Sequence, residues 1–185
     1  KEAGGLPPNA AIGTTVEDQE RMNRNGGELA LAHAALRPVF SFLSCEPLLG
    51  PVDASDAIGA GVGWIITGGE SDQGSHRARP TDPAWFRSLR DQCVAAGVPF
   101  HHKQNGAWAA GEWIFDLDGR LHFRPDDNAV PVAGLSRAGA DERMIWSEGD
   151  RAPEGRGFLH VGAKHSGRLL DGRVWDMRPE VPAYG

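Results

Sequence analysis

Short apolar runs alternate with longer amphipathic segments over residues 1–105 of the chain. The apolar runs have the length of buried strands and occupy residues 10–18, 39–44, 62–67 and 98–103. Helical segments are expected between them, at residues 19–36 and 83–96. Strands that alternate with helices form a parallel sheet in which the helices are crossover connections. We therefore predict an α/β fold for this part of the chain.

The sequence indicates the bounds of one predicted helix more clearly than those of the other. Asp82 followed by Pro83 indicates the start of one helix, because aspartate caps helix N-termini and proline suits the first helical position. The apolar face of this helix is formed by Phe86, Leu89, Cys93 and Val94. Residues 19–36 contain Gly26 and Gly27. Since glycine destabilises a helix interior, we expect this helix to be divided there.

Residues 106–185 follow a different pattern. Residues 114–123 and 168–175 place Asp-Gly between apolar residues, which is typical of a two-residue hairpin turn. Residues 124–157 are rich in Gly, Pro, Asp and Arg, as surface loops are. We therefore predict two parts, βα units over residues 1–105 and an irregular, loop-rich β-hairpin appendage that packs on them.

Charged side chains follow each predicted strand at the point where it ends. Glu17 lies at the end of the first strand, Glu46 and Glu70 follow the second and the third, and Lys103 ends the fourth. The carboxyl ends of parallel strands meet at one edge of the sheet, and this edge carries the chemistry of parallel α/β proteins. We therefore expect a functional site at this edge.

Several of these residues also have a structural interpretation. Glu17 and Asp18 can act as acid and base or hold a ribose diol; alternatively they are helix N-terminal acids stabilised by the helix dipole, which we favour for Asp18. Gly68 and Gly69 can allow the close approach of a ligand whose amine or hydroxyl binds Glu70. The alternative is a turn that ends the strand, followed by a surface acid.

The second and fourth strand ends leave similar alternatives. Glu46 is held rigidly at its strand end, because Pro47 stops the ladder directly after it. Lys103 can bind an anionic group or can be a solvated lysine. Cys45 precedes Glu46, but a lone thiol without a neighbouring base is more often buried and inert than nucleophilic. Cys45 and Cys93 also lack the spacing of metal ligands, so no metal site is expected.

The amino-acid composition argues against several classes of protein. Glycine and proline, at 25 and 13 residues, indicate a loop-rich chain, while six tryptophans and seven phenylalanines argue against disorder. The net charge of −6 gives no support to nucleic-acid binding, which would need a local basic groove. No apolar run approaches the roughly 18–20 residues of a membrane span. Two cysteines without a disulfide framework indicate a cytoplasmic protein.

Several motifs together resemble those of one protein family. They lie at residues 15–19, 42–53, 64–71, 85–93, 97–100, 103–104 and 167–176, and read TVEDQ, FLSCEPLLGPVD, WIITGGES, WFRSLRDQC, GVPF, KQ and GRLLDGRVWD. The chain resembles a phage-associated family of unknown function, found in phages and bacteria, whose barrel looks like that of radical S-adenosylmethionine (SAM) enzymes. The resemblance covers residues 6–105 and 160–179, and the segment 106–159 departs from it.

The resemblance implies that the chain is the C-terminal half of a TIM-like (βα) partial barrel with parallel strands. An upstream half, on the same or a separate polypeptide, would complete the barrel and carry the three-cysteine motif of the family. The 4Fe–4S cluster of a radical SAM site needs three cysteine thiolates, which Cys45 and Cys93 cannot supply. We therefore expect the upstream half to bind the cluster and SAM, and this chain alone to bind neither.

The resemblance also implies roles for the residues at the strand ends. Glu17 would bind the ribose or the amino-acid end of SAM, and Gly68 and Gly69 would allow the close approach of its adenine. The catalytic contacts to the substrate would be made by Glu46, Glu70 and Lys103.

Three functions are consistent with the sequence. The first is the C-terminal part of a radical SAM-like enzyme of phage or bacterial origin, with an unknown substrate for which a nucleotide or nucleic-acid base is a guess. The alternative is a non-catalytic binding or interaction module that kept the barrel scaffold without a cluster. The third is a metal-free hydrolase that uses Glu46 and Glu70.

Overall fold

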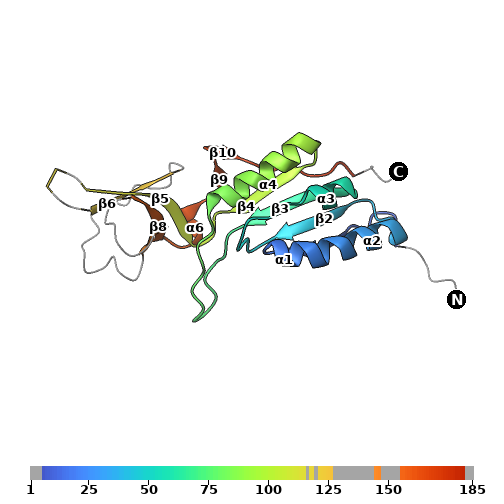
Figure 1. Ribbon diagram of the computed structural model, residues 1–185, viewed down its shortest axis with the longest axis horizontal. Coiled ribbons are helices and arrows are strands. Elements are labelled where there is room, and N and C mark those ends of the chain that lie inside the picture. The colour runs from blue at the N-terminus through green and yellow to red at the C-terminus, as the bar shows by residue number, and fades with distance from the viewer. Residues whose placement is uncertain (1–5, 116, 119–120, 127–143, 147–154, 182–185) are drawn as a thin grey trace. The chain divides into compact units, whose positions relative to one another are not determined.

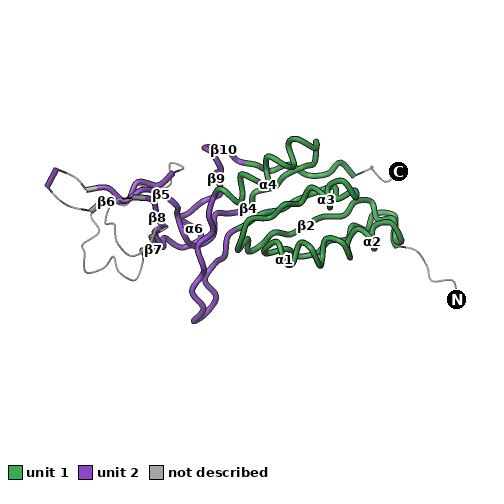
Figure 2. Tube along the Cα trace, in the orientation of Figure 1, with its two compact units in different colours: residues 1–68, 84–103, 175–185 green, residues 69–83, 104–174 purple. Residues whose placement is uncertain are grey.

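The chain folds into two compact units (Figure 2). The computed structural model describes residues 6–115, 117–118, 121–126, 144–146 and 155–181. Unit 1 comprises residues 1–68, 84–103 and 175–185, and unit 2 comprises residues 69–83 and 104–174. The chain passes from unit 1 to unit 2 between Lys103 and Gln104, next to the predicted boundary at residue 105. The compact units differ from the predicted parts in that residues 69–83 belong to unit 2 and residues 175–185 to unit 1.

Unit 1 contains a parallel sheet whose strands follow the chain order β1-β2-β3-β4 (Figure 1). The strands are β1 (Ile12–Thr15), β2 (Ser41–Cys45), β3 (Val62–Gly68) and β4 (Phe100–Gln104). Ile12 is in register with Ser41 in the parallel pair β1–β2, and β2 runs parallel to β3. The mixed α/β class and the parallel sheet predicted from the alternating pattern are therefore confirmed.

Helices connect these strands, and one of them differs from the prediction. The first connection is continuously helical through α1 (Gln19–Arg21), a π-helical turn η1 (Met22–Gly26) and α2 (Gly27–Leu36). The predicted division at the two glycines is wrong, because both adopt right-handed helical dihedrals and the helix widens instead of ending. The later connections are the short helix α3 (Ser55–Gly59), which the sequence pattern missed, and α4 (Pro83–Ala96), which has the predicted bounds.

The two faces of the sheet have different surroundings. The ring of His102 lies 4.6 Å from that of Phe86, so His102 faces α4. Because side chains alternate across a strand, His101 lies on the opposite face, where its ring contacts Trp64 at 6.1 Å. Phe42 lies 6.0 Å from Trp64 on the same side. We call this side, carrying Phe42, Trp64 and His101, the aromatic face.

One edge of the sheet is covered by a later segment of the chain. Residues 175–177 run antiparallel to β4, with His102 N–H donating to the Trp175 carbonyl at 2.9 Å and Met177 N–H to the Phe100 carbonyl at 3.2 Å. The indole of Trp64 donates to the Met177 carbonyl at 3.0 Å. In the described part of the chain, no strand pairs with the other edge, the outer side of β1.

Unit 2 contains an antiparallel sheet in the order β6-β5-β8-β7. Its strands are β5 (Trp108–Phe115), β6 (Leu121–Pro125), β7 (Met144–Trp146) and β8 (Gly155–His160). A buried cluster on this sheet contains Ala109, Trp113, Phe123 and Leu159. The described part of the predicted appendage is thus more regular than the sequence indicated.

The two predicted hairpins are present in unit 2. β5 pairs antiparallel with β6, and β9 (Leu169–Leu170) pairs antiparallel with β10 (Arg173–Val174). Asp171 and Gly172 have φ of 56° and 68°, as the predicted two-residue turn requires. The Asp-Gly turn of the first hairpin lies partly outside the described residues. The short helix α6 (Ala163–Ser166) precedes the second hairpin.

None of the helices in the described ranges combines the length and the apolar character that crossing a bilayer requires.

The close approach of Phe42 to β1 gives a stability prediction. A Cβ at Gly13 would lie 2.4 Å from the Phe42 ring, so Gly13→Ala forces the ring to move. We expect this variant to lose about 1–3 kcal/mol of unfolding free energy in urea denaturation. In the matched control Gly27→Ala, nothing lies within 4 Å of the added Cβ, and we expect a gain of up to about 1 kcal/mol. Equal effects of the two substitutions would contradict the packing described here.

Candidate functional site

An ion pair joins the ends of two strands at the carboxyl edge of the parallel sheet. Lys103, in β4, donates from Nζ to Oε2 of Glu46, which directly follows β2, at 3.2 Å. The lysine side chain is 58% exposed, whereas the glutamate side chain is 20% exposed. The sheet thus brings together two residues that were predicted separately from their positions at strand ends.

The second oxygen of Glu46 has no hydrogen-bond partner among the described residues. Its Oε1 is buried, and no donor among the described residues hydrogen-bonds to it. Gly68, the last residue of β3, borders this oxygen, and a Cβ there would lie 3.1 Å from Oε1. Gly68 therefore packs directly against the Glu46 side chain, where a larger residue would be crowded. We call Glu46, Gly68 and Lys103 the edge site.

A buried hydrogen bond joins two of the three strands that carry the edge site. The Oγ1 of Thr67 and the Nδ1 of His102 are 3.0 Å apart, and both side chains are fully buried. Thr67 precedes Gly68, and His102 precedes Lys103. This hydrogen bond therefore ties the ends of β3 and β4 together directly beside the residues of the edge site.

The segment that follows Glu46 is also held in place. The Leu48 N–H donates to the Gly68 carbonyl at 2.9 Å. Oε1 of Gln19 accepts the Asp53 N–H, and Oε1 of Gln92 accepts the Ala54 N–H, each at 2.7 Å. The two amides hold adjacent backbone groups from different helices, so the loop after β2 has a defined position.

The two cysteines are not suited to nucleophilic or metal-binding chemistry. Cys45 and Cys93 are buried free thiols. Burial, with Cys93 and Glu46 nearby, raises the pKa of Cys45 above its usual range, and burial raises the pKa of Cys93 to about 12. Both therefore stay protonated at neutral pH and are poor nucleophiles or metal ligands. Within the described ranges, no three His, Cys, Asp or Glu side chains form a group that could hold a metal ion.

Glu17 lies in unit 1 but has another partner. Its carboxylate pairs with the guanidinium of Arg21 at 2.5 Å, and its backbone carbonyl accepts the Leu49 N–H at 2.7 Å. Asp18 accepts the Arg21 N–H at 2.8 Å and caps α1, as favoured from the sequence. The Glu17 carboxylate thus has a local structural contact at the start of the helix.

Gly69 and Glu70 belong to unit 2 and make contacts there. A Cβ at Gly69 would lie 2.1 Å from the carbonyl oxygen of Asn105, so glycine is needed for two backbone segments to pass closely. Glu70 accepts the Arg79 guanidinium at 2.7 and 2.9 Å, the Arg79 N–H at 2.6 Å and the His76 ring at 3.3 Å. The bonds from Arg79, opposed by partial burial, lower the pKa of Glu70 to about 2. Both oxygens of this carboxylate are therefore engaged.

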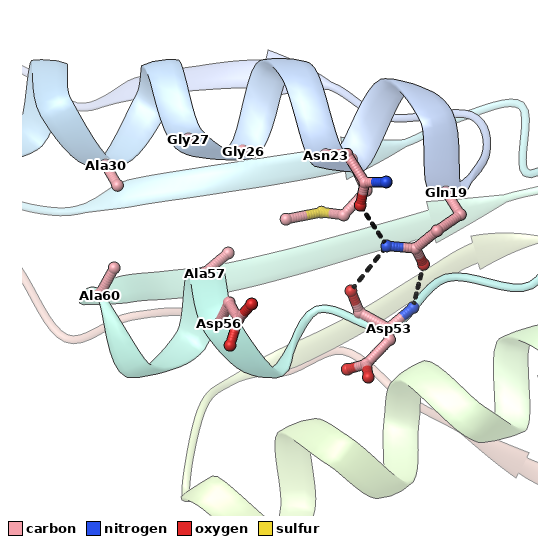
Figure 3. A pocket seen from close by; sticks show the side chains of 10 residues that line it. Gln19, Asn23, Gly26, Gly27, Ala30, Asp53, Asp56, Ala57 and Ala60 are labelled. Atoms are coloured by element: carbon pink, nitrogen blue, oxygen red, sulfur yellow. Dashed lines mark hydrogen bonds between the residues drawn. The ribbon is translucent and has the colours of Figure 1, made fainter.

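A separate cavity, which sequence reasoning missed, lies among the helices of unit 1 (Figure 3). It has a volume of about 380 Å³ and is lined by the small residues Gly26, Gly27, Ala30, Ala57 and Ala60 beside polar groups. Its polar side chains include Gln19, which donates to Asn23 at 2.8 Å. The sequence does not predict this cavity, because the small residues that line it have the same pattern as small residues in ordinary helix packing.

A family model described as "Protein of unknown function (DUF5131)" matches residues 1–179. The chain belongs to this family. The matched range spans residues 106–159 as well. No curated protein and no solved structure matches the chain.

The buried bond behind the edge site can be tested by one substitution. Thr67→Val removes its hydroxyl and keeps its shape, so we expect a loss of about 1–3 kcal/mol of unfolding free energy. The control Thr15→Val alters an exposed threonine of β1, and its effect should stay within about 0.5 kcal/mol. Urea denaturation of both variants measures the difference. A tolerated Thr67→Val would show that the hydrogen bond does not tie the strand ends together.

The Glu70–Arg79 contact gives a pH prediction. Glu70 has a folded pKa of about 2 against an ordinary value of 4.5, so its stabilisation is present above about pH 5 and is lost as the pH falls to about 2. We expect wild type to be more stable than Arg79→Met at pH 6, and this difference to shrink towards pH 2. The control Arg24→Met changes an exposed arginine of η1, and its effect should not depend on pH in this range. Thermal denaturation across pH makes the comparison.

Proposed function

We propose that this chain supplies four strands of a TIM-like (βα) partial barrel in a radical SAM-like enzyme, and that the edge site contacts its substrate. The parallel sheet in chain order and its helical connections support this proposal. The motif resemblance described above supports it as well. The observation that carries the placement of the site is the buried, unpartnered Oε1 of Glu46 at the carboxyl edge of the sheet.

The uncovered side of the sheet supports completion by further strands. Parallel sheets occur almost only with both faces covered, yet Phe42, Trp64 and His101 on the aromatic face are only half-buried. Residues 175–177 already occupy the edge at β4. Additional strands, from the same or a separate polypeptide, would therefore pair with β1 and curve over the aromatic face.

The residues of this chain do not fit an iron–sulfur cluster. Cys45 and Cys93 are buried and protonated, and a cluster site needs three thiolates. In the proposed enzyme the added segment therefore holds the cluster and SAM. This chain contributes the substrate contacts of Glu46 and Lys103.

Two alternative functions have less support. A metal-free hydrolase using Glu46 and Glu70 would need an available Glu70, but Arg79 and His76 occupy that carboxylate. A non-catalytic binding module would use the same edge site without a cluster. The difference between this module and the enzyme is the cleavage of SAM.

The test uses the product of the open reading frame that contains these residues, expressed together with that of the adjacent upstream frame so that a separate polypeptide is included. The protein is reconstituted anaerobically with iron and sulfide, and SAM binding and reductive SAM cleavage are measured by chromatography. We expect an iron–sulfur absorbance band and cleavage of SAM. The exposed-site control Glu28→Gln should leave cleavage unchanged. A protein that takes up no cluster and binds no SAM would overturn the proposed enzyme and leave the binding module.

A further inference from the structure

We propose that the cavity of unit 1 binds a small aliphatic amine, whose alkyl chain lies between α2 and α3 and whose ammonium group pairs with Asp56. The residues that line this cavity fall within 19–30 and 53–60, so they all belong to unit 1. They do not include the residues of the edge site, and the inference is therefore independent of the proposed function.

The cavity is accessible from solvent. Its volume of about 380 Å³ lies near the lower end of the range of roughly 300–1,000 Å³ that is typical of small-molecule sites. Met22, Gly26 and Ala57 are buried and form its floor, whereas Asn23 and Asp56 are exposed at its rim. A small ligand can therefore enter past the rim and reach a buried surface.

The walls of the cavity suit an alkyl chain. Figure 3 shows the methyl groups of Ala30, Ala57 and Ala60 directed into the space between α2 and α3. A Cβ at Gly26 would lie 4.0 Å from that of Ala57, so the two helices approach closely at the floor. Nothing lies within 4 Å of a Cβ at Gly27, where the cavity is wider. An alkyl chain between these walls buries apolar surface, which favours binding.

The helix that borders the cavity is irregular at this place. The π-helical turn η1 contributes Met22, Asn23 and Gly26 to the lining. Single π-helical turns are rare and occur frequently at functional sites. The position of this turn therefore favours a binding role for the cavity over a gap in ordinary helix packing.

Most polar groups around the cavity are already engaged by the protein itself. Oε1 of Gln19 accepts the Asp53 N–H at 2.7 Å, and its Nε2 donates to Asn23 at 2.8 Å. Oδ1 of Asp53 accepts the Ser55 N–H at 2.9 Å. The Asp56 carboxylate, by contrast, has no hydrogen bond or ion pair within the part of the chain that the structure describes. It is therefore available to a donor from a ligand.

The charge of the lining favours a cation. Asp53 and Asp56 are carboxylates, and none of the ten lining residues is Lys, Arg or His. An anion would be repelled, whereas a primary amine is protonated at neutral pH, as the lysine side chain is. A hydrogen bond from an ammonium group to a carboxylate is also stronger than one between neutral groups. A metal ion is disfavoured, because the described residues offer no group of three His, Cys, Asp or Glu side chains.

The test measures ligand binding to the co-expressed protein described above by isothermal titration calorimetry. The probe is n-hexylamine, and it is compared with 1-hexanol, in which a hydroxyl replaces the ammonium group, and with hexanoate, which carries a negative charge. We expect hexylamine to bind. The other two should bind at least about tenfold more weakly, because each lacks the hydrogen bond from a charged donor to the carboxylate.

Two variants connect this binding to the cavity. Asp56→Asn removes the charge and keeps the shape, so it should weaken hexylamine binding at least about tenfold. The matched control Glu28→Gln makes the same change on the exposed surface of α2, outside the lining, and should leave binding unchanged.

The second variant changes the volume of the cavity and not its charge. Ala60→Leu places a larger side chain in the space and should weaken binding, whereas Ala34→Leu alters an exposed alanine of α2 outside the lining and should not. Because Ala60 is exposed, this variant keeps the test valid if Asp56→Asn unfolds. Unfolding is monitored by circular dichroism.

The outcomes that contradict the proposal are distinct from those that concern the enzyme. No binding of hexylamine, equal binding of 1-hexanol or tighter binding of hexanoate overturns the amine as the ligand. Hexylamine binding that both Asp56→Asn and Ala60→Leu leave unchanged overturns the cavity as the site. Tighter binding of a lysine with blocked amino and carboxyl groups overturns a free amine in favour of a protein side chain. Cleavage of SAM is measured separately and does not depend on this cavity.

Discussion

The hydrogen-bonded ladder of the four parallel strands is the constraint on which the site depends. Parallel pairing brings all four carboxyl ends to one edge, and this places Glu46 and Lys103 in contact although 57 residues separate them in the sequence. Alternation along each strand then directs His102 towards α4 and Lys103 towards the opposite side. The buried bond between Thr67 and His102 holds two strand ends in place. The charged pair is thus a product of the backbone pairing and of a hydrogen bond inside the core.

Neighbouring residues at the end of β3 serve different purposes. Gly68 borders the unpartnered oxygen of Glu46 in unit 1, while Gly69 lets the backbone at Asn105 pass closely in unit 2. Glu70, one residue further, is neutralised by Arg79. A motif that looks like a single ligand-binding turn is therefore divided between Gly68, which packs against the Glu46 carboxylate, and two residues with structural contacts in unit 2.

The two edges of the sheet in unit 1 differ in their hydrogen-bond partners, and its aromatic face is only partly covered. The segment at Trp175 and Met177 supplies backbone partners to β4, but the described residues supply none to the outer side of β1. The aromatic face keeps three partly exposed rings, although parallel sheets are ordinarily covered on both sides. The proposal that this sheet is part of a larger barrel rests on this asymmetry.

The sequence determined the parts of the fold that depend on local pattern. The apolar runs predicted the four parallel strands, Asp82 and Pro83 marked the start of α4, and the Asp171-Gly172 turn fixed the second hairpin. Local pattern could not show that the helix continues as a π turn through Gly26, because packing decides whether a glycine ends a helix. It also could not tell which strand-end residues would meet. Only the tertiary structure decided that, since parallel pairing and burial act between residues far apart in the chain, and since Arg21 and Arg79 lie close enough to engage Glu17 and Glu70 while Glu46 keeps one oxygen unpartnered.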